Sequence, residues 1–121
     1  MWSVGMPILN ADYSNLSCEE MAYSMGLQPK YIPLLVESFL EESKGSLEIL
    51  RESIKSVDYI KVKSEAHTLK GSSGNLRFNE IYEMAKKMEF AASSHREDFA
   101  YEECLNAIEK AIGTISLQTL C

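Results

Sequence analysis

A histidine near the middle of the chain stands in a helical spacing pattern that could do chemistry. Steps of three, four and seven residues from His67 lead to Lys70, Gly71 and Gly74. Residues at these spacings share one face of an α-helix, whereas Leu69 falls on the opposite face. The pattern predicts a histidine that projects into solvent beside a lysine, above a patch with no side chains.

This arrangement suits the transfer of a phosphoryl group. A neutral imidazole nitrogen is a good nucleophile near pH 7. The transferring group is strongly anionic, and its transfer depends mostly on positioning and on charge stabilisation, which Lys70 could supply. Gly71 and Gly74 would let another protein's active site approach the imidazole closely. Two glycines inside a helix together destabilise it by about 2 kcal/mol relative to alanine, so their presence needs an explanation.

Each of these residues also has an ordinary structural explanation when it is taken alone. A lone histidine or lysine is usually a tolerated surface residue. Gly74 and Asn75 could simply end the helix. Ser72 and Ser73 could serve local hydrogen bonding to the backbone. It is the joint pattern, rather than any single residue, that favours chemistry.

Two helices are predicted before the histidine. Ser17 and Glu20 have the spacing of a capping box and predict a short helix that stops at Gly26. Apolar residues then recur at alternating steps of three and four as far as Val57, with the same phase on both sides of Gly45. This stripe predicts one long helix over about 30–56.

Three further helices are predicted, of which the first carries the histidine. Asp58 suits the N-cap of that helix. The next helix starts after Asn79, the polar stretch 93–98 forms a loop, and a last helix runs over 101–115. No segment alternates apolar and polar residues over the length of a strand.

We therefore expect an all-α protein with an antiparallel up-and-down four-helix bundle, because short connections force neighbouring helices to run antiparallel. The bundle domain is predicted over 17–121, with the short helix over 17–25 packed across one end. Residues 1–16 show no period and are expected to form an irregular segment.

Charge and composition argue against several classes of function. The net charge of −6 disfavours binding to nucleic acid or to an anionic membrane surface. No apolar run could span a bilayer, and the N-terminus does not resemble a secretory signal. The odd cysteine count, without a Cys-x-x-Cys pair, disfavours a disulfide framework and a zinc site and fits a reducing cytoplasm. We expect Cys18 and Cys104 as thiols in or near the core, and Cys121 at a loose terminus.

The stretch around the histidine resembles the signature of histidine-containing phosphotransfer (HPt) domains, which is roughly His-x-Leu-Lys-Gly-Ser-[Ser/Ala]-x-x-Leu. Every fixed position of that signature is matched, by His67, Leu69, Lys70, Gly71, Ser72, Ser73 and Leu76. The long helix with Phe39-Leu40-Glu41-Glu42 and the later stretch Met84-Ala85-Lys86-Lys87-Met88-Glu89 are also similar to the family, so the resemblance covers about residues 17–115. Many members have glycine where Arg77 stands here, which we expect to change only how the helix ends.

The resemblance implies a phosphoryl carrier that relies on its partners for catalysis and is not itself an enzyme. By resemblance, His67 is phosphorylated through Nε2, and Lys70 stabilises the phosphoryl charge. The expected partner-docking residues are Gly71, Gly74, Ser72, Lys63 and Lys87. For each of the two lysines, an ordinary solvated charge is the alternative.

The implied partners are the receiver domain of a response regulator or hybrid histidine kinase, and also the ATP-binding domain of a histidine kinase. Magnesium would sit in the receiver, so no metal or other cofactor is expected here, and we expect a monomer. The chain fits a stand-alone carrier and a domain of a hybrid kinase alike.

Three other functions compete with the phosphoryl carrier. The same bundle could be an unphosphorylated docking or scaffold module, a possibility that His67→Gln would separate from a relay. A metal-binding or enzymatic bundle needs Glu-x-x-His pairs, and Glu65 has the wrong spacing for one. A purely structural helical adaptor would not explain two helix glycines beside an exposed histidine.

Overall fold

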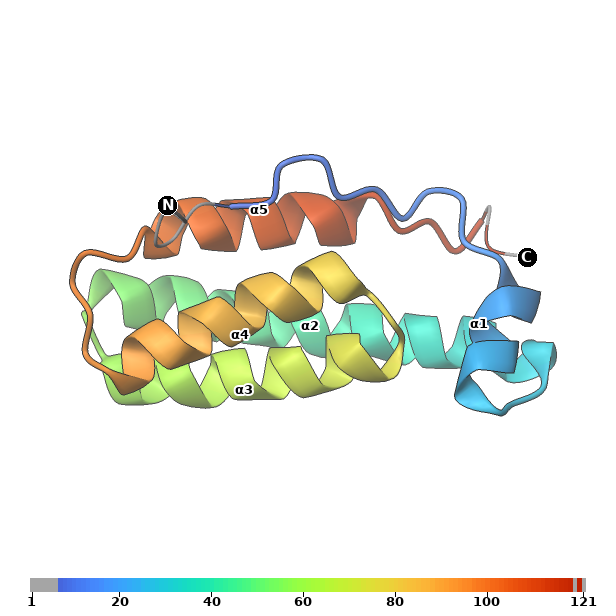
Figure 1. Cartoon of the computed structure of the whole chain (residues 1–121), viewed down its shortest axis with the longest axis horizontal. Coiled ribbons are helices and arrows are strands. Elements are labelled where there is room, and N and C mark those ends of the chain that lie inside the picture. Colours follow the sequence, from blue (N-terminus) through green and yellow to red (C-terminus); the bar gives the residue numbers. More distant parts are fainter. Residues whose placement is uncertain (1–6, 119, 121) are drawn as a thin grey trace.

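The computed structural model describes residues 7–118 and residue 120, and all regular structure in that part of the chain is helical. The elements are α1 (Cys18–Met25), η1 (Pro29–Tyr31, a 3-10 helix), α2 (Ile32–Lys55), α3 (Tyr59–Asn75), α4 (Asn79–Ser93) and α5 (Tyr101–Gly113). The four longer helices α2 to α5 pack together, and α1 lies at one end (Figure 1). The predicted all-α class is confirmed. Within the described residues, no helix is both long and apolar enough to cross a membrane.

The long helix predicted over about 30–56 is confirmed as α2, a continuous helix of 24 residues. Its first predicted turn is the 3-10 helix η1, so the α-helix proper begins at Ile32. Gly45 lies inside it with open space around its Cβ position, so the glycine causes no turn. Ser43 interrupts the apolar stripe, but it is buried and donates its hydroxyl to the Leu40 carbonyl at 3.1 Å.

Three helices end at residues other than glycine that adopt the left-handed conformation. Val57, Arg77 and His95 follow α2, α3 and α4 with φ of 55°, 66° and 52°. In each case the next amide donates back to the last helical turn, at 2.8, 2.9 and 2.9 Å: Asp58 to Ser53, Phe78 to Ser73, and Arg96 to Ala91. These bonds satisfy carbonyls that a helix end leaves unpaired. Val57, expected on the apolar stripe, therefore lies in a turn and is 58% exposed.

Replacing Val57 by glycine should stabilise the protein by about 1 kcal/mol. A β-branched residue costs roughly 1–2 kcal/mol in the left-handed region, and the greater freedom of glycine in the unfolded chain offsets part of the gain. Urea denaturation followed by circular dichroism should show a higher midpoint with an unchanged slope. Lys55→Gly, in the last turn of α2, is the control and should lower the midpoint. A lower midpoint for Val57→Gly would contradict the expectation.

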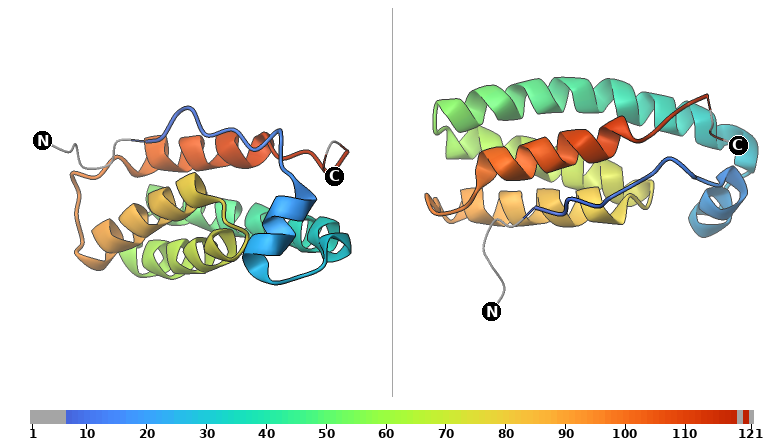
Figure 2. Two further views of the ribbon diagram at one scale, coloured as in Figure 1. Left: turned by 45° about the vertical axis from the view of Figure 1, so that its right-hand side comes forward. Right: turned by 90° about the horizontal axis from the view of Figure 1, so that it is seen from above.

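The segment before α1 has no regular structure over 7–16, yet it is packed against the bundle. The buried ring of Tyr13 lies 4.8 Å from that of Phe78, measured between centroids. Its hydroxyl donates to the Glu80 carboxylate at 2.7 Å and accepts from the amides of Glu80 at 3.1 Å and Ile81 at 3.4 Å. Because α4 has no side-chain cap at its own N-cap residue, Tyr13 supplies that cap from a distant part of the chain. Figure 2 shows the segment running along the bundle towards α1.

The cysteines differ from the sequence-based expectation. Cys18 is disulfide-bonded, so the prediction of a free thiol there is wrong, and the cysteine argument for a reducing compartment does not hold. Cys104 is a free, buried thiol, and burial raises its pKa to about 12. Such a thiol is not a nucleophile at neutral pH. Cys121 and the first six residues of the predicted irregular segment lie outside the described residues.

Candidate functional site

His67 lies in the middle of α3 and its side chain is 67% exposed. The core face of this helix is formed by buried residues at helical spacing, namely Val62, Ala66, Leu69 and Ser73. Asp58 is the N-cap of the helix, as predicted, and its carboxylate accepts from the Lys61 amide at 3.2 Å. Burial of the apolar face therefore turns the imidazole outward, towards the seam between α3 and α4.

A carboxylate from α4 holds both polar side chains of the site. Oε2 of Glu89 lies 2.8 Å from Nδ1 of His67, and Oε1 lies 2.8 Å from Nζ of Lys70. The Glu89 side chain is 17% exposed and that of Lys70 25%. The two bonds are therefore partly shielded from water, although most of the imidazole is open to it. Glu89 had no role assigned from the sequence.

Glu89 and Lys70 hold each other in defined charge states. Partial burial of Glu89 would raise its pKa, but the hydrogen bonds from Lys70 and His67 outweigh it and hold that pKa below the ordinary value. The same hydrogen bond to Glu89 raises the pKa of Lys70. At neutral pH, Glu89 is therefore a carboxylate and Lys70 an ammonium. Lys70 lies one turn from His67 as expected, but its charge is already paired.

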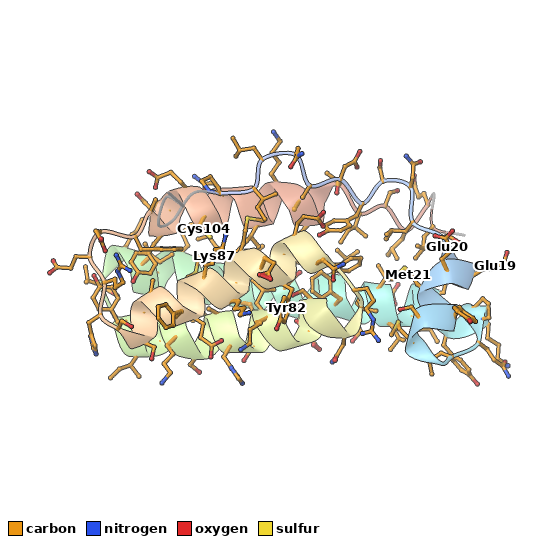
Figure 3. All side chains as sticks on the ribbon, viewed as in Figure 1. Glu19, Glu20, Met21, Tyr82, Lys87 and Cys104 are labelled. Atoms are coloured by element: carbon orange, nitrogen blue, oxygen red, sulfur yellow. The ribbon has the colours of Figure 1, made fainter. Side chains whose placement is uncertain are left out.

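The two glycines of the motif have different surroundings. A Cβ atom on Gly71 would meet nothing within 4 Å, so the surface one turn from His67 is open. A Cβ atom on Gly74 would lie 3.0 Å from the Tyr82 ring of α4, which is labelled in Figure 3. Gly74 therefore borders α4, and the expectation that it leaves room for a partner stays a prediction. Its small size lets α3 and α4 approach each other.

The other predicted docking residues are spread around the site. Ser72 donates its hydroxyl to the Leu69 carbonyl at 3.2 Å, which matches local backbone bonding. Lys63 is exposed on α3, one turn before His67. Lys87 lies towards Cys104 and α5 (Figure 3), and it lines the same cavity as Lys63 and Lys70.

A shallow cavity of about 520 Å³ extends from the site over α4 and carries an excess of positive charge. Five of the chain's twelve lysines and arginines line it, namely Lys63, Lys70, Lys86, Lys87 and Arg96. Two carboxylates, those of Glu83 and Glu89, line it as well. On a chain with a net charge of −6, this is a local basic surface. Such a surface would attract an acidic partner.

Arg77 does more than end the helix. Its guanidinium donates to the carbonyls of Gly74 at 3.1 Å and Asn75 at 3.2 Å, in the last turn of α3. It also donates to the Ser24 carbonyl of α1 at 3.2 Å. A glycine at this position would fit the left-handed backbone but could not make these bonds. Arg77, which replaces the glycine of many family members, therefore links α1 to the helix that carries His67.

No group of three or more histidine, cysteine or acidic side chains among the described residues could hold a metal ion.

Comparison with known proteins identifies the family of the chain. The model of the Hpt domain family matches residues 34–118, which contain His67, Lys70 and Glu89. No curated protein and no solved structure matches the chain. Hpt domains are phosphoryl carriers of two-component signalling rather than free-standing catalysts. The family match covers most of the chain and agrees with the motif around His67, and the chain thus belongs to the Hpt domain family.

Proposed function

We propose that this chain carries a phosphoryl group on His67 between aspartates of receiver domains in a multistep phosphorelay, or takes it from a histidine kinase. The observation that carries the proposal is an exposed imidazole in an Hpt-family chain, held by Glu89 on one side and open on the other. A lone pair of the ring attacks phosphorus, the N–P bond forms as the O–P bond of the aspartyl phosphate breaks, and the aspartate leaves as a carboxylate.

The surroundings of His67 support a receiver as the partner. A receiver's phosphorylated aspartate is anionic, and the basic cavity beside His67 would attract it. The open surface at Gly71 gives it space to approach. In this proposal magnesium belongs to the receiver, the carrier acts as a monomer, and its scaffold is the antiparallel up-and-down four-helix bundle. The cytoplasm is the compartment that the role requires, because a kinase needs ATP.

Phosphoryl transfer from a labelled receiver, or from a kinase with ATP, tests the proposal. Wild type should acquire acid-labile, base-stable label, and His67→Gln should acquire none. His95→Gln is the matched control, because His95 is the second of the two histidines in the chain. It should label as wild type does.

Two outcomes would contradict the relay. Label on His67→Gln would place the phosphoryl group elsewhere. A folded wild type that stays unlabelled with several receivers and kinases would favour the docking or scaffold module, and binding of those partners by His67→Gln would then support that alternative.

A further inference from the structure

We propose that Arg77 is a positioning residue for receiver binding, because its guanidinium holds the C-terminal ends of α3 and α1 together next to the surface that a receiver contacts. The inference rests on the proposed function. The observation behind it is one side chain that donates to carbonyls of two helices. The acceptors are Gly74 and Asn75 of α3, at 3.1 and 3.2 Å, and Ser24 of α1, at 3.2 Å. We call this set of bonds the Arg77 clamp.

Both helices end without a cation of their own. The last turns of α1 and α3 contain no basic residue. The C-terminal end of a helix leaves carbonyls unpaired and carries partial negative charge, which a nearby cation stabilises. At the end of α1, backbone amides bond the carbonyls of Ala22 and Tyr23, and Nη2 of Arg77 bonds the next one, that of Ser24. Arg77 therefore supplies charge and donors to both helix ends at once.

The end of α3 needs such support because its sequence is a poor helix former. Residues 71–75 read Gly-Ser-Ser-Gly-Asn, and each of these types favours a helix less than alanine does. Gly71, where we propose that the receiver approaches, lies one turn before Gly74. The Gly74 carbonyl accepts from both the amide and the guanidinium of Arg77. Fraying of this turn would therefore disturb the surface next to His67.

The clamp also fixes the position of α1. This helix packs mainly against η1 and α2, and its first residue, Cys18, is disulfide-bonded. The bond from Arg77 to Ser24 joins its last turn to the end of α3, across 53 positions of sequence. Figure 1 shows α1 at the end of the bundle where α3 terminates. Loss of the bond would release the last turn of α1, with its 89% exposed Tyr23, from the helix that carries His67.

A fixed arrangement favours binding rather than chemistry. A receiver that must first order the end of α3 and return α1 to its place binds more weakly, in proportion to the fraction of molecules already in the right arrangement. The imidazole of His67 lies ten residues before Arg77 and does not depend on the clamp for its reactivity. Arg77 is exposed, so its bonds compete with water and position the helices without adding much to overall stability.

Arg77→Gly tests the clamp, since glycine fits the left-handed backbone at this position but has no side chain. Amide hydrogen exchange, followed by mass spectrometry, should become faster at the ends of α1 and α3 and stay unchanged in α5. With a receiver that labels wild type, the dissociation constant should rise about fivefold, the change expected for a lost helix cap. The transfer rate at saturating receiver, and modification of His67 by phosphoramidate, a small donor, should stay as in wild type.

Two further variants separate the clamp from the backbone. Val57→Gly replaces another left-handed residue, at the end of α2 and at the opposite end of the bundle from α1, and should bind the receiver as wild type does (Figure 1). Arg77→Lys keeps the positive charge, but an ammonium lacks the planar fork that bonds both helices. It should weaken binding as Arg77→Gly does.

Wild-type exchange in Arg77→Gly would overturn the clamp. Faster exchange at the two helix ends with unchanged binding would overturn its role in receiver binding, and wild-type binding in Arg77→Lys would overturn the role of the fork. These results are distinct from failure of the proposed function. If no receiver or kinase labels wild type, the relay is refuted, but the exchange measurement still decides whether Arg77 holds the two helices together.

Discussion

Replacing Gly71 by arginine should reduce phosphoryl transfer between this chain and a receiver at least about a hundredfold, because a misplaced reacting group loses rate on that scale. Gly71 lies one turn from His67, and a Cβ atom there would meet nothing within 4 Å, so the new side chain would project into the space that the partner needs. Its positive charge would attract an acidic partner, so any loss reports bulk rather than repulsion. Transfer should be followed as the rate of label exchange with a phosphorylated receiver.

The same substitution should raise the free energy of unfolding by up to about 1 kcal/mol, since arginine is a better helix former than glycine. Gly45→Arg is the matched control, because Gly45 also lies inside a helix with open space around its Cβ position. It should be stabilised to a similar extent and transfer normally. Phosphoramidate, a small donor, should still modify Gly71→Arg. Normal transfer from a receiver to Gly71→Arg would refute the proposed approach at this surface.

Removing the side chain of Tyr13 should destabilise the protein by about 3–5 kcal/mol in Tyr13→Ala, the range for a buried aromatic ring. Tyr13→Phe keeps the ring but leaves the amides of Glu80 and Ile81 without their cap, and should cost about 1–2 kcal/mol. Urea denaturation would measure both values. Thermal midpoints should fall by about 4 °C for each kcal/mol.

Tyr23 provides the control for these changes, because its side chain is 89% exposed on α1. Both Tyr23→Phe and Tyr23→Ala should stay within about 0.5 kcal/mol of wild type. Wild-type stability in Tyr13→Ala would mean that the segment before α1 does not help to hold the bundle. Residues 7–16 lie outside the region matched by the family model, so the experiment also asks whether the matched region is sufficient for stability.

The elements of this fold could be predicted because each leaves a periodic pattern in its own stretch of sequence. The stripe that continues in phase through Gly45 predicted one helix, and α2 is continuous there. The face opposite Leu69 predicted an exposed histidine, and the structure places His67 there. Both inferences need only the 3.6-residue period of a single helix.

The contacts between elements could not be predicted in this way. The bridge from Glu89 to His67 spans 22 residues, and the bond from Tyr13 to Glu80 spans 67. Such pairs depend on how one element packs against another, and the apolar period of a single helix does not determine that packing. The surroundings of Gly74 are of the same kind, since the Tyr82 ring of α4 lies against its Cβ position only because the two helices pack together.

The ends of the helices are a second feature that the sequence predicts incompletely. Glycine is the usual signal for a left-handed residue after a helix, and it marks the end of α1 at Gly26. At Val57, Arg77 and His95 the backbone takes the same conformation without that signal. At each of these positions the amide of the next residue donates to a carbonyl in the last turn of the helix, which holds the turn against the local preference of the residue.

The exposure of the His67 side chain also affects how long a phosphoryl group could stay on the imidazole. A phosphoryl group on an imidazole that is 67% exposed would meet bulk water between encounters with a partner. The lifetime of the phosphorylated form would then be limited by spontaneous hydrolysis of the N–P bond. Hydrolysis would compete with transfer of the phosphoryl group to the next receiver. At micromolar receiver, association at about 10⁶ per molar per second brings a partner roughly once each second. The concentration of the receiver would thus decide what fraction of the phosphoryl groups is transferred before hydrolysis.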